Sequence, residues 1–269
     1  MEKLAVWSET RAVRFGAIDK SDSMTLDALL DFFQEAAISH AENLGVGREV
    51  MARTNQVWIL SRMSVQVDRR PGFGETVTVR TWPRGGEKLF ALRDFDMLDA
   101  DGIPVVRARS CWLIIDIEKR RPLRPQSTTD KLPLNDGMDA LPAAAALEEN
   151  PSLQKITERR AHYTDMDYNG HVNNVSYIRW MEDALDPALL ENARSMRLDI
   201  NYLNEVLKDE VTGIWTAPIS AASYAVASHA MAHYAAAFEG RKEQDKQTAF
   251  RAELRLWRQG FTSRVLHPH

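Results

Sequence analysis

The sequence predicts an α+β fold made of two copies of one unit, each an antiparallel sheet wrapped around a buried helix. The first observation is an amphipathic helix at residues 25–45, followed by four stretches rich in β-branched and aromatic residues. The second is that the order strand, helix, strand begins again after residue 155, with the two helices offset by roughly 150 residues. The third is length, because 269 residues accommodate two units of about 135 residues each.

The helix of the first unit is indicated by apolar residues that recur at spacings of three and four, with acidic residues on the opposite side. The apolar positions are Leu26, Leu29, Leu30, Phe33, Ala37, Ala41 and Leu44. We expect Thr25 to cap the start of this helix and Gly45 its end. A strand is expected before the helix, and further strands after it at residues 57–68, 76–82, 89–98 and 105–117, with turns at residues 71–74, 84–86 and 99–102.

Residues 118–155 have a different character, because prolines are scattered among Ser, Thr, Asp and Ala without a sustained period. This composition predicts a linker long enough to cross one face of the molecule. We therefore place an N-terminal unit at residues 1–125, the linker at 126–155 and a C-terminal unit at 156–269. In the second unit we expect strands at residues 158–163 and 196–203 and a helix at 175–185. Residues 217–238 contain ten alanines, which favour a helix where the repeat predicts strands.

Composition excludes several classes of protein. Apolar residues make up 44% and charged residues 27%, as in a globular protein, and the formal net charge of −4 provides no global attraction for nucleic acid. The single cysteine, Cys111, excludes an intrachain disulfide framework and fits a reducing compartment. Residues 1–23 lack the apolar core of a signal peptide or of a membrane-spanning helix, so we expect a cytoplasmic protein without membrane insertion. His229 and His233 would share a helical face but lack a third ligand, so no metal site is expected.

The most informative segment is TDMDYNGHVNNVSY at residues 164–177, between a predicted strand and a predicted helix. Two carboxylates, an amide and an imidazole occur together there, and the unpaired N–H groups of a helix N-terminus can hold a developing oxyanion. The plainer interpretation is a turn at Asn169 and Gly170, a helix cap at Asn174 and a partly buried His171. The clustering of these side chains favours an active site.

This segment, extended to TDMDYNGHVNNVSYIRW, resembles the active-site signature of the hot-dog thioesterases. NGHVNN followed by Tyr177 resembles in particular the acyl-acyl carrier protein thioesterases of plants and bacteria. LLDFFQEAAISHAENLG and VWILSRMSVQVDRRPGFGETVTVRTWPRG resemble the N-terminal repeat of that family, so the resemblance extends over most of the chain.

The resemblance implies a double hot-dog fold, in which the sheets of the two units join side by side. It also implies hydrolysis of the thioester of fatty acyl-acyl carrier protein, which releases free fatty acid and the free carrier in fatty acid biosynthesis. The implied partner is acyl carrier protein (ACP). No cofactor is implied, because the phosphopantetheine arm arrives on the carrier.

Residue by residue, the resemblance places the catalytic Asp, Asn and His of the family at Asp167, Asn169 and His171, and its catalytic Glu at Glu205. The plant enzymes carry a cysteine directly after this Glu, whereas this sequence has Val206. A thiolate mechanism needs a cysteine near a base. Since the only thiol, Cys111, belongs to a strand of the first unit, we do not expect cysteine catalysis.

Two mechanisms remain compatible with these residues. In the first, Glu205 is the general base for a water molecule, Asp167 and His171 orient and polarise the site, and Asn169 donates a hydrogen bond to the thioester oxygen. In the second, Asp167 attacks the thioester as a nucleophile and forms an anhydride.

The corresponding loop of the first unit, residues 15–25, has neither His nor Asn. We therefore expect the first unit to be catalytically silent and to hold the acyl chain. The plainer interpretation of its apolar residues is ordinary core packing. The candidates for lining the chain are Leu29, Phe33, Ala37, Trp58 and Ile59.

An acidic carrier protein requires an electropositive patch on its partner. The first candidate cluster is Lys119, Arg120, Arg121 and Arg124, and the second is Arg69 and Arg70. Two rival functions remain, an acyl-coenzyme A thioesterase of the same superfamily and a non-catalytic acyl-binding module. The sequence leaves open the preferred acyl length and whether two chains pair as a homodimer.

Overall fold

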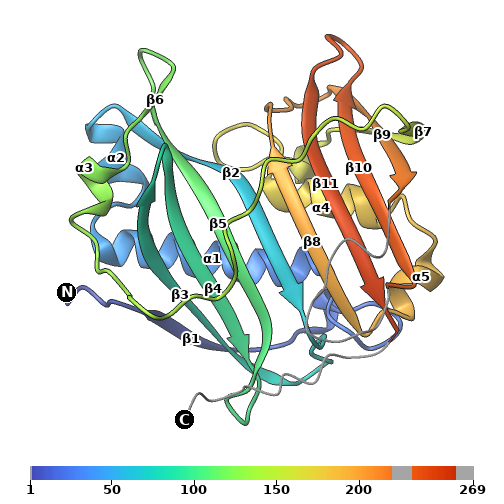
Figure 1. Ribbon diagram of the computed structural model, residues 1–269, viewed down its shortest axis with the longest axis horizontal. Helices are drawn as coiled ribbons and strands as arrows, with labels where there is room; N and C mark the ends of the chain where they lie inside the picture. Colours follow the sequence, from blue (N-terminus) through green and yellow to red (C-terminus); the bar gives the residue numbers. More distant parts are fainter. Residues whose placement is uncertain (1, 220–231, 259–269) are drawn as a thin grey trace.

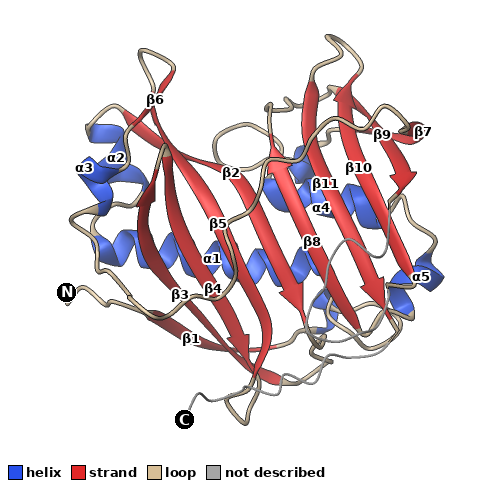
Figure 2. Cartoon of the chain, viewed as in Figure 1, coloured by secondary structure: helices blue, strands red, loops and turns tan. Residues whose placement is uncertain are grey.

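The computed structural model describes residues 2–219 and 232–258, which form one antiparallel sheet with two central helices on one of its faces (Figures 1 and 2). The N-terminal unit contains β1 (Trp7–Ala12), α1 (Leu26–Leu44), α2 (Arg48–Arg53), β2 (Gln56–Val67), β3 (Thr76–Glu87), β4 (Phe90–Leu98), β5 (Pro104–Asp116), β6 (Arg121–Leu123) and α3 (Gln126–Thr129). The C-terminal unit contains β7 (Gln154–Arg160), α4 (Asn174–Glu182), α5 (Pro187–Glu191), β8 (Ser195–Tyr202), β9 (Val211–Pro218), β10 (Tyr234–Lys242) and β11 (Thr248–Trp257).

The order of the strands shows that the two units are related by a pseudo-two-fold axis. The path through the sheet is β1-β3-β4-β5-β2-β8-β11-β10-β9-β7, so β7, β9, β10, β11 and β8 repeat the arrangement of β1, β3, β4, β5 and β2. At the centre, β2 pairs with β8 in antiparallel register from Arg62 opposite Asn201 to Val67 opposite Met196. The predicted duplication therefore produces one continuous sheet.

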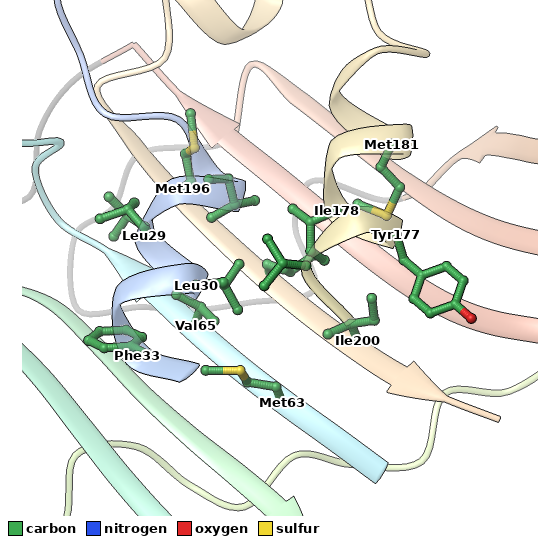
Figure 3. Close-up of a cluster of buried hydrophobic side chains, with 14 of the residues drawn as sticks. Leu29, Leu30, Phe33, Met63, Val65, Tyr177, Ile178, Met181, Met196 and Ile200 are labelled. Atoms are coloured by element: carbon green, nitrogen blue, oxygen red, sulfur yellow. The ribbon is translucent and has the colours of Figure 1, made fainter. Parts of the chain in front are cut away.

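The core lies between this sheet and the helices, and it is continuous across the junction of the units. Alternate residues of β2, such as Met63 and Val65, point toward α1, and their neighbours on β8 point the same way. Figure 3 shows side chains of α1 and α4 packed against these strand residues. The helix residues in this contact are each at most 4% exposed, and they are Leu29, Leu30, Phe33, Tyr177, Ile178 and Met181. The apolar periodicity of the predicted first helix thus corresponds to its buried face.

The two ends of α1 are completed in different ways. Gly45 adopts the left-handed conformation at φ 75° and ends the helix, as predicted. Thr25 occupies the N-cap position, but its side chain donates to Asp27 and does not cap the helix. The carboxylate of Glu182, the last residue of α4, accepts instead from the amides of Leu26 at 2.9 Å and Asp27 at 3.1 Å. A residue of the second unit therefore caps the helix of the first.

Two further local predictions were wrong. Residues 84–86 do not reverse the chain; they form a bulge within β3, with Gly85 at φ 77°, and the chain turns at Lys88. The second helix ends at Glu182, earlier than residue 185, because Asp186 caps a separate short helix, α5. The alanine-rich segment 217–238 includes the end of β9 and the start of β10, and residues 220–231, His229 among them, lie outside the described residues.

The segment after α3 crosses the sheet face opposite the helices (Figure 1). The amide of Ala140 donates to Asp94 of β4 at 2.9 Å. On β8, Asn201 accepts from the amide of Leu147 at 2.7 Å and donates to the carbonyl of Ala145 at 3.0 Å. Because it is hydrogen-bonded to strands of both units, this segment holds the outer face of the pseudo-dimer together.

Candidate active site

The loop before α4 is organised by the carboxylate of Asp167. A bridge between Met166 and Val172 closes the loop, and the amide of Asp167 donates to the carbonyl of His171 at 2.8 Å. The Asp167 carboxylate accepts from the amide of Asn169 at 2.8 Å, from its side-chain Nδ2 at 3.2 Å and from the amide of His171 at 3.3 Å. These three N–H donors hold the Asp167 carboxylate in one orientation within the loop.

His171 faces Glu205, which follows β8. A bridge between His171 and Leu207 brings the two segments together, and His171 Nε2 lies 3.1 Å from Glu205 Oε2. The side chain of His171 is 36% exposed and that of Glu205 is 65% exposed. Solvent can therefore reach both groups.

Behind this cluster, the start of α4 is fixed by a cap and by a buried tyrosine. The side chain of Asn173 accepts from the amide of Val175 at 3.1 Å. Tyr177 packs against Trp180 and Tyr202, and its hydroxyl is hydrogen-bonded to the backbone of Val206. Burial raises the pKa of Tyr177 above its usual range, and the charges of nearby Asp167 and Glu205 add to the shift. Tyr177 is therefore a neutral wall of the site.

The structure thus brings together all four predicted catalytic residues, as two contacting pairs. His171 contacts Glu205 directly, Asp167 contacts Asn169 directly, and Asp167 is joined to His171 through the His171 backbone amide. Sequence reasoning missed a link to the first unit, in which Arg48 of α2 stacks on the ring of Tyr168 at 3.6 Å. No local sequence pattern marks that pair, because its members are more than a hundred residues apart.

The loop of the first unit repeats the backbone geometry of the candidate site. The amide of Asp19 donates to the carbonyl of Ser23 at 3.0 Å, as Asp167 does to His171. The amide of Met24 donates to the carbonyl of Pro71 at 2.8 Å, as that of Val172 does to Val206 at 2.9 Å. Asp19 is therefore the counterpart of Asp167, and Ser23 that of His171.

By the same correspondence, Arg70 of the first unit stands where Glu205 stands in the second. Its guanidinium forms an ion pair with Asp19 and donates to the carbonyl of Met24 at 3.0 Å, and the Arg70 side chain is only 2% exposed. The prediction that Arg70 belongs to a docking surface is therefore wrong. An ion pair between the buried Arg70 and the partly exposed Asp19 fills the first loop, where the second has an open cluster of acid, amide and imidazole.

Of the predicted acyl-chain residues, Phe33 and Ala37 line a small cavity of about 20 Å³ between α1 and the sheet. Such a space holds roughly one water molecule. Leu29 is fully buried in the core, and Trp58 Nε1 donates to the carbonyl of Val46 at 2.9 Å. Ile59 alternates with Trp58 along β2 and is 44% exposed, so its predicted position in the wall of an acyl pocket was wrong.

The remaining basic residues proposed for docking lie on the surface. Lys119, Arg120, Arg121 and Arg124 are exposed in and beside the turn between β5 and β6. Arg69 is exposed and donates to both carboxylate oxygens of Glu75 at 2.9 Å.

Cys111 lies on β5 and is 2% exposed. Alternation along β5 places it on the face opposite α1, because its neighbour Ser110 lines the cavity beside that helix. The thiol contacts the crossing segment through a hydrogen bond with the backbone of Ala144, and burial raises its pKa. It is therefore on the wrong side of the sheet to attack a substrate beside His171.

Within residues 2–219 and 232–258, no group of three or more His, Cys, Asp or Glu side chains converges as metal ligands. No helix in that part of the chain is both long and apolar enough to cross a membrane.

Comparisons with known proteins identify the family. The profile of the Acyl-ACP thioesterase N-terminal domain matches residues 5–129, and that of the Acyl-ACP thioesterase C-terminal domain matches residues 148–253. A palmitoyl-acyl carrier protein thioesterase of Gossypium hirsutum is 28% identical over 224 residues, which cover 77% of this chain and 53% of that protein. An oleoyl-acyl carrier protein thioesterase of Arabidopsis thaliana is 26% identical over 233 residues, 78% of this chain and 62% of that protein. The chain spans about half the length of most such relatives.

Solved structures confirm the fold. An acyl-ACP thioesterase from Bacteroides thetaiotaomicron superimposes with a TM-score of 0.79 at 21% identity, covering 94% of this chain and 98% of that one. A 12:0-ACP thioesterase from Umbellularia californica gives a TM-score of 0.76 at 21% identity, covering 93% and 96%. The expected double hot-dog architecture is therefore confirmed. Since the two family profiles together match most of its residues, the chain belongs to the acyl-ACP thioesterase family.

Proposed function

We propose that the protein hydrolyses the thioester of fatty acyl-ACP, releasing free fatty acid and the free carrier in fatty acid biosynthesis. The observation that carries this proposal is the open cluster in the second unit, in which Glu205 lies 3.1 Å from His171 beside the Asp167–Asn169 pair. A non-catalytic acyl-binding module would have no need of an exposed acid paired with an imidazole at a helix N-terminus. Membership of the family adds support for the substrate class.

In the mechanism that we favour, Glu205 removes a proton from a water molecule while the water oxygen attacks the thioester carbonyl carbon. The carbon–sulfur bond then breaks, and Glu205 returns the proton to the departing thiol. His171 holds the Glu205 carboxylate in place. Asn169 uses one side-chain N–H for Asp167, and we assign its second N–H to the thioester oxygen, on which negative charge develops.

The alternative, attack by Asp167 with formation of an anhydride, uses the same residues. The Asp167 carboxylate already accepts three N–H donors, which engage the oxygen lone pairs that an attack on the thioester would need. A single turnover in ¹⁸O-water tests the anhydride route. Direct attack by water places the label only in the fatty acid, so label found in the Asp167 side chain would exclude direct attack.

We place the acyl chain between α1 and the sheet, where Phe33 and Ala37 line the small cavity. Because the cavity is small, a chain must displace flexible side chains such as that of Met63, another of its lining residues. Carrier docking is assigned to the exposed residues Lys119, Arg120, Arg121, Arg124 and Arg69.

A reducing compartment such as the cytoplasm is the proposed location, on the basis of the single free cysteine. Size-exclusion chromatography with light scattering measures whether two whole chains pair as a homodimer.

The test of the proposed function is the rate of free-thiol release from acyl-ACP and acyl-coenzyme A substrates of the same chain length, measured side by side. We expect a higher kcat/KM with acyl-ACP. Higher values with acyl-coenzyme A would favour the coenzyme A thioesterase. No release from either substrate would leave the acyl-binding module.

A further inference from the structure

The pseudo-two-fold axis pairs Gln34 of α1 with Glu182 of α4. Each is the eighth residue after the first residue of its helix, which is Leu26 in α1 and Asn174 in α4. The segments before the two helices match bond for bond, as in the pairs Asp19–Ser23 and Asp167–His171. Gln34 and Glu182 therefore occupy equivalent positions in the two units, although Gln34 has an amide and Glu182 a carboxyl group.

In the first unit, Glu182 caps the N-terminus of α1. The two oxygens of Glu182 accept from the amides of Leu26 and Asp27. Its oxygens satisfy N–H groups that the start of a helix leaves unpaired. No donor is left free at those two amides for a ligand.

At the second unit, the equivalent position is occupied by Gln34, and a cavity lies between it and the start of α4. Gln34 lines that cavity together with Asn174, Val175 and Tyr202. Asn174 follows His171 by three residues, and Tyr202 precedes Glu205 by three, so the two chain segments that carry the candidate site both contribute to the cavity wall. Within the described part of the chain, the structure gives Gln34 no side-chain hydrogen bond. The Gln34 side-chain amide is therefore a donor at the cavity without a protein acceptor.

We propose that the Gln34 side chain donates a hydrogen bond to the carbonyl oxygen of the bound thioester. This inference rests on the proposed function. An N–H donor favours the negative charge that develops on this oxygen during attack, whereas a carboxylate at the same position would repel it. Asn169 shares its amide with Asp167, so Gln34 supplies a second donor from the opposite unit. The silent first unit thereby contributes a residue to the chemistry of the second.

The experiment measures kcat and KM of Gln34→Met with acyl-ACP substrates of eight and of sixteen carbons. Methionine keeps the length of the side chain and removes the donor. Removing one oxyanion donor typically lowers kcat by about 10²- to 10³-fold. We expect a loss of that size, equal for both chain lengths, with KM little changed. A residue that only lines the acyl chain would instead alter KM and the chain-length preference, and that result would overturn the inference.

A second variant, Gln34→Glu, guards against misfolding. It recreates at α4 the cap that Glu182 provides at α1, so its melting temperature should equal or exceed that of the wild type while kcat falls. Retention of at least half of the wild-type kcat by a folded Gln34→Glu or Gln34→Met protein would overturn the inference. Glu182→Gln is the matched control at the equivalent position and should keep the wild-type kcat. If the wild type itself releases no thiol, the proposed function fails and Gln34 is not the cause.

Discussion

Glu182 makes the stability of the protein depend on pH in a direction opposite to that of most carboxylates. Burial, and then the charge of Asp27, raise its pKa from 4.5 to about 8, against the hydrogen bonds from the Leu26 and Asp27 amides. Because the folded state holds this proton more tightly than the unfolded chain, the contribution to stability is fully present below about pH 4.5. It is lost as the pH rises from there to about 8.

The size of the effect follows from linkage. While the unfolded chain has lost one proton that the folded state keeps, the free energy of unfolding falls by about 1.4 kcal/mol per pH unit. For a protein of this size, 1 kcal/mol corresponds to roughly 2–4 °C in melting temperature. The substitution Glu182→Gln removes the ionisation and keeps one oxygen that can accept from α1.

The assay is thermal unfolding followed by circular dichroism at half-unit steps between pH 5 and 8, for the wild type and Glu182→Gln. We expect the melting temperature of the variant, relative to that of the wild type, to rise by roughly 4 °C per pH unit across this range. Asp183→Asn is the control, because Asp183 is the next residue, exposed and paired with Arg159 at 3.3 Å. Parallel curves for Glu182→Gln and the wild type would refute the assignment of this proton to Glu182.

Three further predictions concern the ion pair of the first unit, the thiol and the docking surface. Arg70→Met removes the hydrogen-bonded charge partner of the partly exposed Asp19 and should lower the free energy of unfolding by about 1.5–3 kcal/mol in a urea titration; a loss under about 0.5 kcal/mol would contradict a stabilising role for this pair. Cys111→Ala should keep the wild-type rate of thiol release, and a hundredfold loss would restore a role for the thiol. Reversing the charges of Lys119, Arg120 and Arg121 should raise the KM for acyl-ACP more than the KM for acyl-coenzyme A, and should weaken the salt dependence of acyl-ACP hydrolysis. An equal change in both KM values would exclude this surface from carrier docking.

Much of the fold could be predicted from the periodicity of apolar residues. In each unit, one face of the helix packs against the alternate strand residues that point toward it. The error at residues 84–86 has a local cause. A glycine with positive φ serves equally in a turn and in a bulge, and only the partner strand decides between them. The cap of α1 was assigned to Thr25 because sequence rules consider only neighbours in the chain. Its actual partner, Glu182, comes from the other unit.

The loop of the candidate site could be located from the sequence because Asp167, Asn169 and His171 lie close together in the chain, whereas Glu205 was placed only through the resemblance to the family. Arg70 was misassigned because a cationic residue has no local mark of burial, and its partner Asp19 lies on a distant loop. Gln34 could not be identified from the sequence alone. Its equivalence to Glu182 follows from the pseudo-two-fold axis, and this axis is set by the pairing of β2 with β8.

The central claim is that hydrolysis takes place at the cluster of the second unit while its counterpart in the first is silent. The most direct test compares kcat/KM for acyl-ACP hydrolysis by Glu205→Gln and by Ser23→Ala, the latter at the counterpart of His171. Removal of a general base typically costs about 10²- to 10⁴-fold. We predict such a loss for Glu205→Gln with an unchanged melting temperature, and a rate within threefold of the wild type for Ser23→Ala. Near wild-type hydrolysis by Glu205→Gln would contradict the claim.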